Sequence, residues 1–151
     1  MKFYSFEYAD KDLVDIEGFD ASVGYTQWTD KIASSDAHLV AYFRKLGAVI
    51  IAKTNVPQTM LSFECSNPLF GRTTNPWSIG KAHTCGGSSG GEAALLAQSG
   101  SAMGIGSDIG GSLRIPTAFC GIYSLKPSYG RISTDGARSE YPTDSSGTAI
   151  N

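Results

Sequence analysis

Two short segments built almost entirely of small residues constrain the fold of this 151-residue chain more than any other feature. Residues 86–91 read Gly-Gly-Ser-Ser-Gly-Gly, and residues 108–112 read Asp-Ile-Gly-Gly-Ser. Most of the 18 glycines lie between positions 80 and 121. Because glycine lets the backbone turn tightly and approach other groups closely, this region must contain closely packed turns.

The segments before the first glycine block predict a helix followed by a strand. Residues 36–46 have the period of a helix, with Ser35 as the expected N-cap and Gly47 at the C-terminal end. The apolar face of this helix consists of Leu39, Val40, Phe43 and Leu46. Residues 48–52 are a short apolar run that predicts a buried strand, and residues 54–81 are loop-like.

The segments after the first glycine block continue this alternation. We expect a helix over residues 92–98, a strand over 102–107, a helical turn over 114–119 interrupted by Pro116, and a strand over 122–125. The chain is therefore predicted to be α/β, with a mixed, partly parallel sheet flanked by helices. Residues 1–10 have no clear period, residues 11–131 form the predicted domain, and residues 132–151 form a polar tail.

Composition argues against several functional classes. The net charge is −2 and no basic patch occurs, so nucleic acid is not an expected partner. The cysteines are odd in number (Cys65, Cys85 and Cys120) and include no Cys-x-x-Cys pair, which argues against a disulfide scaffold and a metal site. We expect them to be small core residues of a cytoplasmic protein. No segment has the apolar length of a membrane span, and no cofactor motif is present.

Familiar glycine-rich motifs fit poorly. A P-loop needs Gly-Lys-Ser/Thr, and neither glycine block contains that lysine. A dinucleotide-binding fingerprint follows a strand, whereas the first glycine block follows prolines and His83. Residues 86–90 match the Gly-x-Ser-x-Gly elbow, but that fold places its histidine after the serine, whereas His38 and His83 come before it. The order His83, Asp108, Ser112 remains arithmetically possible for a chymotrypsin-like triad.

A serine nucleophile can instead use a lysine base. The lysine must lose its charge, and lowering its pKa from about 10.4 to roughly 7–8 by burial disfavours the charged form by about 4 kcal/mol. Backbone amides at consecutive small residues can then hold the oxyanion. The expected donors are the amides of Ile109, Gly110, Gly111 and Ser112.

The sequence around both glycine blocks resembles the amidase signature family. The resemblance rests on residues 86–116 and extends to Lys-Thr-Asn-Val-Pro-Gln at 53–58 and Cys-Ser-Asn-Pro-Leu-Phe-Gly-Arg at 65–72. These upstream stretches are similar to the fatty-acid amide hydrolase and fungal acetamidase branches. The similarity covers roughly residues 11–131, so the resemblance implies an incomplete amidase signature fold.

The resemblance also implies a Ser–Ser–Lys triad that cleaves a small-molecule carboxylic amide. Ser112 would attack the carbonyl, and Ser88, on a cis peptide bond, would relay the proton to a lysine. The context Lys11-Asp-Leu-Val-Asp-Ile-Glu-Gly18 matches the family's catalytic lysine, so Lys11 is the predicted base and Lys53 is structural. The predicted supporting residues are Ser89, Asp108 and Arg114, the last as partner of a carboxylate.

One neighbour of the predicted base is unfavourable. Asp10 directly precedes Lys11, and a carboxylate there is expected to favour the charged ammonium. Two alternatives to an active hydrolase therefore stay open. The chain could be a truncated, non-catalytic relative, or a protein similar to a glutamyl-tRNA amidotransferase subunit that needs a partner chain. No oligomeric state follows from the sequence.

Overall fold

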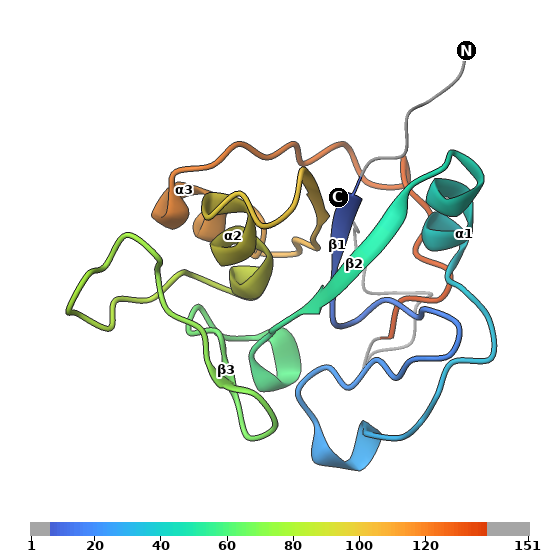
Figure 1. The fold of residues 1–151 in the computed structure, drawn as a ribbon, viewed down its shortest axis with the longest axis horizontal. Coiled ribbons are helices and arrows are strands. Elements are labelled where there is room, and N and C mark those ends of the chain that lie inside the picture. The colour runs from blue at the N-terminus through green and yellow to red at the C-terminus, as the bar shows by residue number, and fades with distance from the viewer. Residues whose placement is uncertain (1–6, 139–151) are drawn as a thin grey trace.

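A sheet of three parallel strands organises the protein (Figure 1). The structure is a computed structural model and describes residues 7–138. β1 (Glu7–Lys11) lies between β2 (Val49–Thr54) and β5 (Met103–Ile105). In this register Lys11 pairs with Thr54 of β2, and Asp10 pairs with Ile105 of β5. The predicted α/β class with a partly parallel sheet is confirmed.

The central strand comes from a segment in which the sequence shows no period. Residues 8–11 of β1 are all buried, because the strand is covered on both faces. A strand buried on both faces does not need to alternate apolar and polar residues. The predicted domain limit between residues 10 and 11 therefore falls inside a strand.

α1 (His38–Lys45) covers one face of the sheet. Its Val40 is fully buried, and Phe43 packs on Tyr8 of β1 with ring centroids 5.2 Å apart. The predicted N-cap is wrong, since the helix begins after Ala37 and no side chain caps it. The predicted end is confirmed, because Gly47 follows the helix with a φ of +89°.

α2 (Gly90–Ala97) covers the opposite face and contacts all three strands (Figure 1). α3 (Arg114–Cys120) packs against α2. The predicted interruption at Pro116 is wrong. Pro116 is the third residue of α3, where its missing N–H would have no helical partner in any case. The three cysteines are free and buried beside α2, as predicted for small core residues.

Two strand predictions need correction. β2 is not buried as expected, because it lies at the edge of the sheet in the described part of the chain; Val49 is 48% and Ile51 41% exposed. Residues 122–125 form no strand, since nothing in the described ranges pairs with them, and Tyr123 is fully exposed.

The remaining elements are short and lie in connecting segments. They are the 3₁₀ turns Thr26–Trp28 and Gln58–Met60 and the antiparallel pair β3 (Ser66–Asn67) and β4 (Gly71–Arg72). Within residues 7–138 no helix is both long and apolar enough to cross a bilayer.

The first part of the predicted polar tail packs on the domain. Ala137 forms an antiparallel bridge with Val14, and the Arg138 guanidinium makes an ion pair of 2.7 Å with Asp15. Ile132 packs against the main apolar core. These contacts bring residues 132–138 back to the segment after β1. The rest of the predicted tail lies outside the described residues.

Candidate active site

Lys11 ends the central strand and is completely buried. Its Nζ donates hydrogen bonds to Ser88 Oγ at 2.7 Å and to Ser107 Oγ at 2.6 Å. Burial lowers the pKa of Lys11 from 10.5 to about 7, although the charges of Cys65, Asp108 and Glu92 act in the opposite direction. A substantial fraction of the amine is therefore neutral near pH 7, which is the state that a general base requires.

Ser88 lies just before α2 and is 1% exposed. The peptide bond between Gly87 and Ser88 is cis, as predicted. A hydroxyl has one donor and two acceptor sites, so Ser88 can accept the hydrogen bond from Lys11 while it donates its own proton elsewhere. This geometry suits a group that passes a proton between a lysine and another hydroxyl.

Ser112 precedes α3, and its segment lies beside that of Ser88. The backbone N–H of Ser89 donates to the carbonyl oxygen of Ser112 at 3.0 Å. The Ser89 hydroxyl contacts the backbone of Ser107 at both its carbonyl and its N–H, each at 3.3 Å. The two glycine-serine segments are therefore neighbours in space, and the side chain of Ser112 is partly exposed.

Asp108 holds the turn before Ser112 in place. Its carboxylate accepts hydrogen bonds from the amides of Gly111, Leu113 and Arg114 and from the Arg114 guanidinium. Burial alone would raise the pKa of Asp108, but Arg114 and these amides lower it well below its usual range. The predicted pairing of Arg114 with a carboxylate is confirmed.

The same contact changes the predicted oxyanion hole. The Gly111 amide donates to Asp108 Oδ1 at 2.7 Å, so it is committed to the turn. The prediction for Gly111 is therefore corrected: its amide is not free to hold an oxyanion. The amides of Ile109, Gly110 and Ser112 stay candidates.

Asp10 does not have the effect on Lys11 that we expected. Adjacent residues of a strand point to opposite faces, so the two side chains diverge. Burial raises the pKa of Asp10 well above its usual value, and the charge of Glu92 raises it further. Neither carboxyl oxygen accepts a hydrogen bond of good geometry among the described residues, and the nearby backbone N–H of Lys11 lowers the Asp10 pKa by less than burial raises it.

Two buried polar residues at this site were missed by the sequence analysis. Ser107 accepts from Lys11, and Glu92 is 3% exposed and accepts a hydrogen bond from Thr54. Ser107 directly precedes Asp108 at the end of a predicted strand, a position that could have marked it. Glu92 resembles an ordinary acidic residue of a first helical turn, so its sequence context held no signal.

Other candidate residues lie apart from this centre. His83 is exposed in a loop, and no hydrogen bond in the described part of the chain joins its imidazole to Asp108 or Ser112. Within residues 7–138, no group of three or more histidine, cysteine and acidic side chains is arranged to hold a metal ion.

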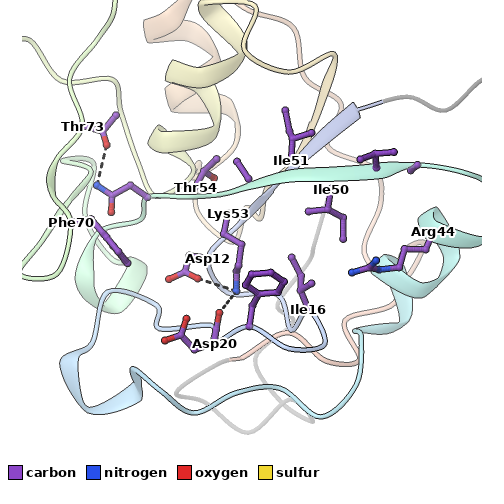
Figure 2. Close-up of a pocket in the computed structure, with 15 residues that line it drawn as sticks. Asp12, Ile16, Asp20, Arg44, Ile50, Ile51, Lys53, Thr54, Phe70 and Thr73 are labelled. Carbon is purple, nitrogen blue, oxygen red and sulfur yellow. Dashed lines mark hydrogen bonds and ion pairs between the residues drawn. The ribbon is translucent and has the colours of Figure 1, made fainter.

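Lys53 has a structural role, as predicted. Its Nζ contacts Asp12 Oδ1 at 3.0 Å and donates to the carbonyl oxygen of Asp20 (Figure 2). It also donates to the carbonyl oxygen of Val14. It therefore ties β2 to the segment that follows β1. The open hollow beside it, of about 930 Å³, is lined in part by Ile16, Ile50 and Phe70 and includes none of the predicted catalytic residues.

Comparison with known proteins identifies the family of this chain. The model of the Amidase family matches residues 9–148. Over 128 residues the chain is 48% identical to fatty-acid amide hydrolase 1 of Sus scrofa, a match that covers 85% of this chain and 22% of that protein. It is 46% identical over 126 residues to an acetamidase of Aspergillus oryzae, covering 83% of this chain and 23% of the relative.

Solved structures have the same fold. A fatty acid amide hydrolase structure superposes with a TM-score of 0.82 at 35% identity, covering 89% of this chain and 23% of that one. A glutamyl-tRNA(Gln) amidotransferase subunit of Thermotoga maritima gives a TM-score of 0.81 at 30% identity, covering 87% and 29%. This chain thus spans about a fifth to a quarter of the curated relatives described above. The chain belongs to the Amidase family.

Proposed function

We propose that this chain carries the catalytic centre of an amide hydrolase that works through an acyl-enzyme on Ser112. The observation that supports this most directly is the contact of 2.7 Å between Lys11 Nζ and Ser88 Oγ, buried beside the segment of Ser112. A lysine whose pKa is about 7 can accept a proton at physiological pH.

The proposed steps use only these groups. Neutral Lys11 takes the proton of Ser88 while Ser88 takes the proton of Ser112, and the Ser112 oxygen forms a bond to the amide carbon. The amides of Ile109, Gly110 and Ser112 would hold the negative oxygen of the tetrahedral intermediate. When the C–N bond breaks, the proton on Lys11 returns through Ser88 to the leaving amine. A water molecule then attacks the carbonyl carbon of the ester and gives its proton through Ser88 to Lys11. The bond to Ser112 breaks, and the proton returns from Lys11 through Ser88 to the Ser112 oxygen.

The substrate class is a carboxylic amide of a small molecule. The names of the relatives mention fatty-acid amides and acetamide, so they favour an amide hydrolase without fixing the size of the acyl group. In structural superpositions the identity is 35% to a fatty acid amide hydrolase and 30% to the amidotransferase subunit, and the two curated relatives described above are a fatty-acid amide hydrolase and an acetamidase, which favours the hydrolase branch.

Reaction with a fluorophosphonate probe tests the proposal. We expect the probe to label Ser112 in the folded chain and Ser112→Ala to abolish labelling, with the modified peptide identified by mass spectrometry. Ser128→Ala, at an exposed serine, is the matched control and should be labelled like the wild type. A folded wild type that is not labelled would support the alternative of a non-catalytic relative.

A further inference from the structure

Glu92 is an ionisable group that the proposed reaction does not use. It lies in the first turn of α2, one helical turn after Ser88, and is 3% exposed. An acidic residue of a first turn usually stays in water, where it gains from the helix dipole without losing hydration. Burying the carboxyl group against a sheet is costly, so its position needs a reason.

The contacts of Glu92 place its carboxyl group over the strand that ends in Lys11. Thr54 donates to Glu92 Oε2 at 2.6 Å, and Thr54 is the register partner of Lys11 in β2. On the other side, Gly104 of β5 lies so close to Oε1 that an added methyl group would overlap it. The carboxyl group thus lies between β2 and β5, on the face of β1 that α2 covers.

Lys11 lies on that same face. Its side-chain amine contacts Ser88, two residues before the start of α2, so the lysine and Glu92 both lie between the sheet and this helix. The lysine of β2, Lys53, makes an ion pair with Asp12, which follows β1. Within residues 7–138, no ion pair involves Glu92, and Oε1 has no hydrogen-bond partner.

The ionisable neighbours of Glu92 are few. β1 contributes Lys11 and Asp10, and the residues of β5 contribute none. Cys65, directly before β3, and Asp108, before α3, also act on the charge of Lys11. Burial raises the pKa of Glu92 to about 7, although Thr54 and the charge of Lys11 lower it. Near neutral pH, Glu92 and Lys11 are therefore both partly ionised.

We propose that Glu92 is a positioning residue for Lys11: its buried carboxylate, fixed between Thr54 and Gly104, adds a negative charge that makes the lysine hold its proton more tightly. This proposal rests on the proposed role of Lys11 as the base. A glutamine at position 92 would keep the volume and the bond with Thr54 but not the charge, so Glu92→Gln separates an electrostatic role from a structural one.

NMR titration of the full chain with ¹³C-labelled lysine tests this without any need for activity. The Lys11 signal is assigned by its loss in Lys11→Met. Its chemical shift is then followed against pH, and the midpoint of that change is the quantity compared between variants. We expect Glu92→Gln to lower the Lys11 midpoint by on the order of one pH unit, the size expected for a nearby unit charge at an effective dielectric constant of about 20. Glu17→Gln, at an exposed carboxylate, should leave it unchanged.

A folded Glu92→Gln protein with the wild-type Lys11 midpoint would overturn the proposal. If that variant does not fold, Thr54→Val provides the second test. Loss of the hydroxyl raises the pKa of Glu92 and reduces its charge, so the Lys11 midpoint should again fall, and an unchanged midpoint refutes the coupling. If Ser112 of the wild type is not labelled by the probe, the proposed function fails, whereas the titration still reports on the coupling.

Discussion

A lysine and two carboxyl groups with displaced pKa values lie on or against the central strand. Lys11 is pushed toward its neutral form, and Asp10 and Glu92 are pushed toward their protonated forms, in each case chiefly by burial. Each displacement of one pKa unit disfavours the charged form by about 1.4 kcal/mol. The cost at Lys11 has a chemical purpose in the proposed reaction, whereas nothing in the described structure explains the burial of Asp10.

Replacing Asp10 should therefore stabilise the protein, and more so as the pH rises. Below the ordinary pKa of 3.8 the residue is protonated in both states. Above it, the unfolded chain ionises while the folded chain keeps its proton, so stability falls toward the raised pKa, by about 1.4 kcal/mol per pH unit. Asp10→Val removes this loss. We expect its gain in free energy of unfolding, measured with urea, to be larger at pH 8 than at pH 5.

The control for this comparison is Glu7→Gln, an exposed carboxylate on the same strand. Its effect on stability should stay within about 0.5 kcal/mol at both pH values. An Asp10→Val protein that is less stable than the wild type at pH 8 would show that the carboxyl group has a stabilising partner.

At the scale of elements, α2 matters most, because it joins the sheet to the segment of Ser88. Gly91 of this helix meets the backbone of Asn55 at the end of β2, and its N–H donates to the Asn55 carbonyl at 3.2 Å. A side chain at this position would overlap the Asn55 backbone. Glycine is thus required by the close packing of helix and strand, although it is a poor helix former.

Gly91→Ala is predicted to destabilise the fold. At an exposed helix position, replacing glycine with alanine stabilises a protein by up to about 1 kcal/mol. At position 91 we expect the opposite, a decrease of about 1–3 kcal/mol in the free energy of unfolding, because the added methyl group overlaps the Asn55 backbone. Gly110→Ala is the matched control, because nothing lies within 4 Å of the added carbon. Thermal unfolding of both variants measures the difference, and a Gly91→Ala protein as stable as the wild type would refute the packing argument.

Sequence patterns predicted the elements whose signals are local. The helices α1 and α2, the strands β2 and β5 and the two glycine-serine segments follow from periodicity and glycine placement. β1 could not be predicted in this way, because Asp10 and Lys11 make a doubly covered strand look polar. The contacts of Glu92 and Ser107 depend on residues 38 and 96 positions away, which no local pattern records.

At the scale of the whole molecule, the sheet is open at β2 in the described part of the chain. Ile51 is 41% exposed on this edge strand, which presents unpaired backbone groups beside apolar side chains. Such an edge favours pairing with another chain. The relatives described above are about four times longer than the stretch that this chain matches.

We therefore expect the isolated chain to self-associate and Ile51→Lys to reduce this. Sedimentation velocity over a range of concentrations measures the effect. Tyr123→Lys serves as control, because Tyr123 is fully exposed but lies on no strand and should leave association unchanged. Equal association of both variants and the wild type would mean that β2 is not the contact.

The central claim is that a buried lysine, neutral near pH 7, activates Ser112 through Ser88, and the pH dependence of fluorophosphonate labelling tests it most directly. Because the neutral amine is the base, the rate should rise with pH through a midpoint near the Lys11 pKa of about 7. Lys11→Met and Ser88→Ala should each lose this rise. A wild-type rate that is independent of pH, or that rises only near about 10 as for an ordinary lysine, would contradict the account.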